Sequence, residues 1–115
     1  MTVKECYEFL GADYDGVLGR LMKEERVTKY LGKFLQDPML EPLEKALEEK
    51  DYETAFRCAH NIKGVCQNLG ITVLADVSSD LTEKLRGGEP SEDITPELEQ
   101  VRQEYAKTVE ALETL

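Results

Sequence analysis

The apolar residues of this 115-residue chain recur at intervals of three and four through most of its length. Such spacing places them on one side of an α-helix, because each helical residue turns by about 100°. Four long segments carry an apolar stripe of this kind, and we expect helices at residues 24–49, 51–69, 71–87 and 96–114. No segment alternates apolar and polar residues as a half-buried strand would. The pattern therefore predicts an all-α protein.

Turn-forming residues mark where these helices begin and end. Asp37-Pro38 interrupts the first helix, because proline disfavours helical backbone at the residue before it, and we expect a break or kink there. Asp51 can cap the second helix, and Gly70 can end it in a left-handed conformation. Thr95, which is followed by a proline, has the hydroxyl of a helix cap and predicts the start of the last helix.

The connections between these segments favour a bundle. The turn at Gly70 is short enough to make its two helices antiparallel, and the simplest arrangement that buries all four stripes is an up-down-up-down four-helix bundle. Two short helices are expected ahead of it, at residues 2–10, ended by Gly11, and at residues 13–20. They would cover the bundle. The length of the chain suits one domain, so we treat residues 1–115 as a single unit.

The negative charge of the chain limits the classes of partner that we expect it to bind. Asp and Glu number 24 against 14 Lys and Arg, which gives a net charge of −10. Nucleic acids and anionic membrane surfaces are bound by clustered basic residues, so neither is an expected partner. No apolar run approaches the ~20 residues of a membrane span, and the N-terminal residues lack the apolar core of a signal peptide. Cys6, Cys58 and Cys66 have no disulfide-framework or zinc-knuckle spacing, so we expect a cytoplasmic location.

His60 is the only histidine, and it lies away from the apolar stripe of its predicted helix. We therefore expect its imidazole to face water. A lysine lies one helical turn beyond this histidine. Residues three, four and seven positions away share the stripe of His60: Phe56, Arg57, Lys63, Gly64 and Gln67.

A short motif surrounds this histidine. The sequence AHNIKG at residues 59–64, continued by NLG at residues 68–70, resembles the histidine-containing phosphotransfer (HPt) domains of bacterial and fungal phosphorelays. The pattern of that family is a histidine, a lysine one turn on, a glycine next and a second glycine shortly after. The resemblance is good over residues 30–86, and the two ends match in helical character only.

The resemblance implies a role for three residues of the motif. His60 would accept a phosphoryl group on Nε2 from the aspartyl phosphate of a receiver domain and pass it to another receiver. Lys63 would stabilise the charge of that phosphoryl group. Gly64 would leave room beside the ring for the incoming receiver, although a glycine at this position also suits close helix packing.

The next helix is expected to support the imidazole. In related domains a residue on this facing helix, often glutamine, hydrogen-bonds the other ring nitrogen and fixes the rotation of the ring. The matching position here is Thr82, and its side chain is shorter. The hydrogen bond to the ring would then be absent, bridged by water, or made by Ser78 or Ser79. Arg86 matches a basic position of some members and can bind the phosphoryl group or the partner. Alternatively, Arg86 is a solvated cation at the end of the helix, where the helix dipole favours a positive charge.

Other residues near His60 are candidates for the partner surface. Phe56 and Ile71 are predicted apolar anchors, because the helical wheel places them beside His60. Arg57 is a candidate partner contact. Gln67 is a candidate support for the site.

The resemblance also implies partners and excludes cofactors. The expected partners are receiver domains of response regulators and of a hybrid sensor histidine kinase. The chain would be a monomeric phosphoryl carrier without a nucleotide site or catalytic activity of its own, and magnesium would belong to the receiver. Two other hypotheses stay open. One is a helical adaptor that binds receiver or kinase domains without being phosphorylated. The other is a metal-binding bundle, which would need several inward histidine and glutamate ligands.

Overall fold

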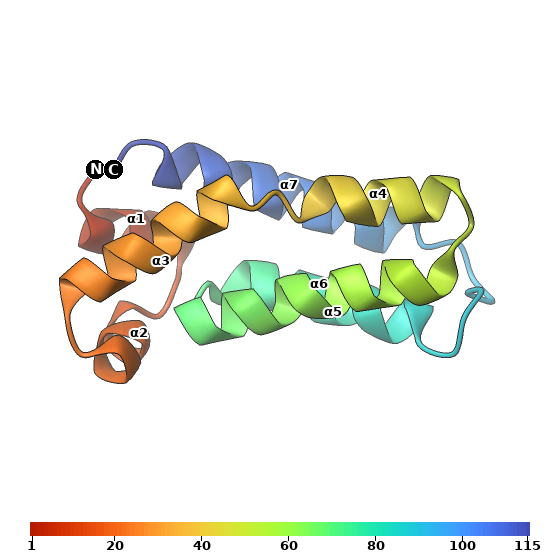
Figure 1. Cartoon of the computed structure of the whole chain (residues 1–115), viewed down its shortest axis with the longest axis horizontal. Coiled ribbons are helices and arrows are strands. Elements are labelled where there is room, and N and C mark those ends of the chain that lie inside the picture. Colours follow the sequence, from red (N-terminus) through yellow and green to blue (C-terminus); the bar gives the residue numbers. More distant parts are fainter.

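The computed structural model describes all 115 residues and contains seven α-helices and no strand. Four arms run side by side along a molecule that measures 42 × 23 × 20 Å (Figure 1). This architecture confirms the predicted all-α four-helix bundle. No helix is both long and apolar enough to cross a membrane. The helices are α1 (Val3–Leu10), α2 (Tyr14–Leu21), α3 (Glu24–Gln36), α4 (Leu40–Glu48), α5 (Tyr52–Leu69), α6 (Thr72–Leu85) and α7 (Thr95–Leu112).

The first arm consists of α3 and α4, and it is broken between them as the sequence predicts. Asp37 ends α3, and α4 begins after Met39. The last arm holds this break in place, because the Met39 N–H donates a hydrogen bond of 3.1 Å to the Tyr105 hydroxyl on α7. The Tyr105 ring also stacks on Phe34, with 5.5 Å between ring centroids. The end of α3 and the break therefore pack against α7, and an ion pair between Arg102 and Glu44 joins α7 to α4.

Local capping fixes the ends of α5. The Asp51 side chain accepts a hydrogen bond from the Thr54 N–H, and Gly70 ends the helix in the left-handed conformation at φ 71°. Both ends agree with the prediction. The expected cap of α7 is different. Thr95 is the first residue of that helix, and its hydroxyl and N–H both donate to the Asp93 carboxylate, so Thr95 does not cap the helix itself.

The two N-terminal helices pack over the end of the bundle where α5 turns into α6 (Figure 1). The buried Tyr7 hydroxyl donates to the Leu69 carbonyl at 2.7 Å, and the Asp13 N–H donates to the Gly70 carbonyl at 2.8 Å. The Arg20 guanidinium donates to the carbonyls of Gln67 and Asn68. The last carbonyls of a helix have no partner within the helix, so the hydrogen bonds to the Asn68 and Leu69 carbonyls satisfy groups that α5 itself leaves open.

The single core of the bundle also encloses a thiol whose titration is testable. Burial raises the pKa of the Cys66 thiol from 9.0 to about 12. The contribution of the buried, neutral Cys66 thiol to the free energy of unfolding is therefore fully present below pH 9. It is lost as the pH rises toward 12. We expect the free energy of unfolding in urea to fall above pH 9, and the fall to be shallower in Cys66→Ala.

Cys58→Ala is the matched control for this measurement, because Cys58 lies on the same helix but is only half-buried. Its profile above pH 9 should stay closer to that of the wild type. Equal slopes in the wild type and in Cys66→Ala would show that this thiol does not govern the loss of stability.

Candidate functional site

His60 lies near the middle of α5 on the side that faces away from the core. Ala59 and Ile62, which flank it, are both 0% exposed and fix the rotation of the helix. The imidazole is exposed, as the sequence predicts. It makes no hydrogen bond and no ion pair with the rest of the chain. Its ring nitrogens are therefore free to react with a group from outside.

An aromatic ring lies parallel to the imidazole. The centroids of the Phe56 and His60 rings are 6.1 Å apart, and their planes differ by 6°. The Arg86 guanidinium from α6 lies over the same Phe56 ring, 5.1 Å from its centroid. Two hydrogen bonds, of 3.0 and 2.9 Å, join Arg86 to the Glu83 carboxylate. Phe56 thus connects the imidazole on α5 to an ion pair on α6.

Three basic residues carry the positive charge around His60, and they differ in whether an acidic side chain pairs with them. Lys63 is half-buried and has no ion-pair partner. Arg86 is engaged by Glu83, and Arg57 lies 3.5 Å from the Glu53 carboxylate in an exposed pair. The hydrogen bond from Arg86 and, to a lesser extent, the charge of Lys63 lower the pKa of the Glu83 carboxyl. Lys63 is therefore the cation beside His60 that is free to meet an incoming anion.

Gly64 leaves an open space beside the imidazole. It is exposed, and no heavy atom of a neighbouring group lies within 4 Å of the position that a Cβ would occupy. Packing within the chain therefore does not require a glycine here, which removes the helix-packing alternative.

The structure does not provide the hydrogen bond that α6 was expected to make with the imidazole. Thr82 is 0% exposed, and its hydroxyl donates to the Ser78 carbonyl at 2.6 Å. The buried Ser78 hydroxyl has no hydrogen-bond partner, and neither it nor Ser79 contacts the ring through a hydrogen bond. Of the alternatives that the sequence left open, a direct hydrogen bond to His60 from Thr82, Ser78 or Ser79 is therefore not made in this structure. The short threonine side chain turns back to its own helix instead.

One of the two predicted apolar anchors is wrong. Ile71 is 2% exposed and belongs to the core. The helical wheel of α5 does not extend to this residue, because the left-handed backbone of Gly70 ends the helix and turns the chain inward. Phe56 is half-buried and remains accessible, and Arg57 and Gln67 are exposed. These three residues surround His60 on the face of α5 where the sequence places them.

Sequence reasoning missed Glu83, although its position offered a signal. Glu83 precedes Arg86 by three residues, and residues three apart on a helix are neighbours that form ion pairs. Arg86 was interpreted from the sequence as a phosphoryl ligand, a partner contact or a solvated cation, and an ion pair with Glu83 was not considered.

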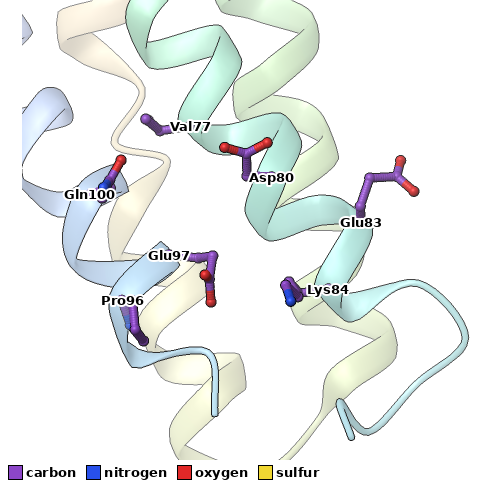
Figure 2. Close-up of a pocket in the computed structure, with 7 residues that line it drawn as sticks. All are labelled: Val77, Asp80, Glu83, Lys84, Pro96, Glu97 and Gln100. Atoms are coloured by element: carbon purple, nitrogen blue, oxygen red, sulfur yellow. The ribbon is translucent and has the colours of Figure 1, made fainter. Parts of the chain in front are cut away.

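A concave region away from His60 lies between α6 and α7. Figure 2 shows Lys84 and Glu97 facing one another across it, while the Glu83 carboxylate points away from its centre. Its volume is about 310 Å³, and only one of its lining residues is apolar. Nowhere in the chain do three or more His, Cys, Asp or Glu side chains gather as metal ligands would. The residues that line this region are Val77, Asp80, Glu83, Lys84, Pro96, Glu97 and Gln100.

Comparison with known proteins gives one match. The family model described as Hpt domain matches residues 30–114 of the chain. The matched region contains the broken arm from within α3 onward together with α5, α6 and α7. It therefore extends past residue 86, where the sequence resemblance weakens, to the end of the bundle. No curated protein and no solved structure shows a match to the chain.

Proposed function

The chain belongs to the Hpt domain family, and we propose that His60 is the residue that carries the phosphoryl group. Hpt domains are phosphocarrier modules of two-component phosphorelays, and their partners are receiver domains. The observation that carries the assignment to His60 is the exposure of the only histidine on the outer side of α5, with Lys63 one helical turn away. The open space at Gly64 supports the same assignment.

In the proposed transfer, the chain provides a nucleophile for an aspartyl phosphate on a receiver. The lone pair of Nε2 of the neutral His60 ring attacks phosphorus, and a P–N bond forms. The bond between phosphorus and the aspartyl oxygen breaks, and the carboxylate leaves with that electron pair. The proton on the other ring nitrogen can then pass to water. The reverse reaction with the aspartate of a second receiver completes the relay.

The remaining groups of the site act by charge and by space. Phosphoryl transfer depends mainly on alignment and on stabilising charge at the phosphoryl oxygens. The free ammonium of Lys63 would stabilise that charge, and Arg86 would contribute once it leaves Glu83. Magnesium belongs to the receiver in this proposal. The three cysteines are free, which favours a reducing compartment, and we place the exchange in the cytoplasm.

The direct test is to mix the chain with a receiver domain that has been charged with radioactive acetyl phosphate. We expect the chain to take up label that is lost in acid and kept in base, as phosphohistidine is, and to give it to a second receiver. Acetyl phosphate without a receiver is the control for direct labelling. A chain that binds the charged receiver and takes no label would instead be a helical adaptor.

Gly64→Ala should separate the function of this site from its stability. Alanine is favoured over glycine inside a helix, so we expect the free energy of unfolding to rise by roughly 0.5–1 kcal/mol. The added methyl group stands beside the imidazole where the receiver must approach, so we expect slower uptake of label from a charged receiver. Urea unfolding and the initial rate of labelling measure the two effects.

Gly19→Ala is the matched control. Gly19 is an exposed glycine of α2, and a Cβ there would also meet nothing within 4 Å. Its substitution should give a similar gain in stability and leave the labelling rate unchanged. Unchanged labelling in Gly64→Ala would remove steric access as the reason for this glycine.

A further inference from the structure

We propose that Phe56 is a positioning residue, whose ring fixes the plane of the His60 imidazole by parallel stacking. The inference rests on the proposed function of His60, because it concerns the orientation of the same ring. Phe56 would orient the ring in this chain, where no hydrogen bond from α6 does so. Phe56 would then act on the chemical step, and not as an anchor that only binds the receiver.

The geometry of the two rings is that of a stacked pair. Phe56 precedes His60 by four residues, so both side chains lie on the same face of α5. A centroid distance of 6.1 Å and an interplanar angle of 6° fall within the range of offset-stacked aromatic pairs. The imidazole therefore lies parallel to the Phe56 ring and remains exposed to water.

Phe56 is itself restrained, which makes it a suitable support. Its ring is half-buried and packs against the core of the bundle. The Arg86 guanidinium lies over the ring, and Glu83 holds that guanidinium with two hydrogen bonds. The exposed imidazole is therefore in contact with a ring that is fixed by both α5 and α6.

No other group of the chain holds the imidazole by a directed contact. His60 has no hydrogen-bond partner, and the Thr82 hydroxyl is used by the Ser78 carbonyl. The stack with Phe56 is the one aromatic contact of His60. Without it, the imidazole would be free to turn about the bond that joins it to Cβ.

Fixing the plane of the imidazole matters for the reaction because the lone pair of Nε2 lies in that plane. In-line attack requires this lone pair to point at phosphorus, so a ring held in one plane needs less reorientation once the receiver is bound. A ring that turns freely would spend only part of its time in the reactive orientation. Phe56 should therefore raise the rate of transfer within the complex and leave receiver affinity largely unchanged.

The test compares Phe56→Leu and Phe56→Tyr in single-turnover transfer from a charged receiver at several receiver concentrations. We expect Phe56→Leu to lower the maximal rate about tenfold, because misplacing a reacting group can slow a reaction by this factor or more, and to leave half-saturation unchanged. Phe56→Tyr keeps the stacked face and should stay near the wild-type rate. Tyr52→Leu is the matched control, since Tyr52 is half-buried on the same helix and makes no aromatic contact with His60.

A second readout does not depend on transfer. A stacked ring shifts the NMR signals of the imidazole protons, so Phe56→Leu should move these signals toward unstacked values and Phe56→Tyr should not. If Phe56→Leu loses helix content, Phe56→Met keeps the apolar volume without a ring, and the same changes are expected of it.

Three outcomes would overturn the inference. They are a wild-type maximal rate in the folded Leu or Met variant, a change in half-saturation alone, and imidazole signals that do not move. A change in half-saturation alone would make Phe56 a docking anchor. If the wild-type chain takes no label at all, the proposed function fails, and the NMR signals still decide whether the stack exists.

Discussion

His60→Gln should abolish the uptake of label from a charged receiver and leave the fold intact. Glutamine has no nitrogen lone pair available for attack on phosphorus, because its amide nitrogen is conjugated with the carbonyl. The imidazole is exposed and makes no hydrogen bond in the folded chain, and glutamine is a good helix former. We therefore expect the free energy of unfolding to change by less than about 0.5 kcal/mol, as measured by urea unfolding.

The control for this substitution is Asn61→Ala, which changes an exposed polar residue next to His60 on α5. It should keep both the label and the stability. Label that persists in His60→Gln would place the acceptor on another residue. If His60→Gln instead supported signalling as well as the wild type, the adaptor hypothesis would replace the proposed function.

The sequence predicted the elements of this fold well because their signals are local. Asp51 caps α5 through its own third neighbour, and Gly70 ends the helix through its own backbone conformation. The proline at position 38 breaks the first arm for a reason contained in two residues. The exposure of His60 follows in the same way from the buried residues beside it, Ala59 and Ile62.

What the sequence did not predict depends on contacts between helices and on side-chain rotation. Thr82 lies on the correct helix, but its hydroxyl has a choice of partners and bonds to Ser78. Ile71 lies close to the site in sequence, yet the backbone turn at Gly70 carries it into the core. The connection from His60 through Phe56 to Arg86 and Glu83 spans α5 and α6, and no spacing rule within one helix contains it.

Gly70→Ala should be the most destabilising single-methyl substitution among the glycines of this chain. Gly70 has a φ of +71°, and a Cβ there would lie 2.7 Å from the Asp13 carbonyl oxygen, which is part of the backbone. The strained left-handed conformation costs an L-residue roughly 1–2 kcal/mol, and the crowding adds roughly 1–3 kcal/mol. We therefore expect urea unfolding to show a loss of about 2–5 kcal/mol.

Gly11→Ala separates the two causes of this loss. Gly11 has a similar φ of +64°, but a Cβ there would meet nothing within 4 Å. Its substitution should cost only the roughly 1–2 kcal/mol of the left-handed conformation. The excess loss in Gly70→Ala then measures how closely the segment before α2 packs on the turn between α5 and α6, where the Asp13 N–H also bonds the Gly70 carbonyl. Equal losses in the two variants would mean that the segment moves aside freely. His60 lies in the middle of α5, so the folded fraction of either variant should still take up label. Gly70, the second glycine of the motif, would then serve the packing of the N-terminal helices and not the chemistry.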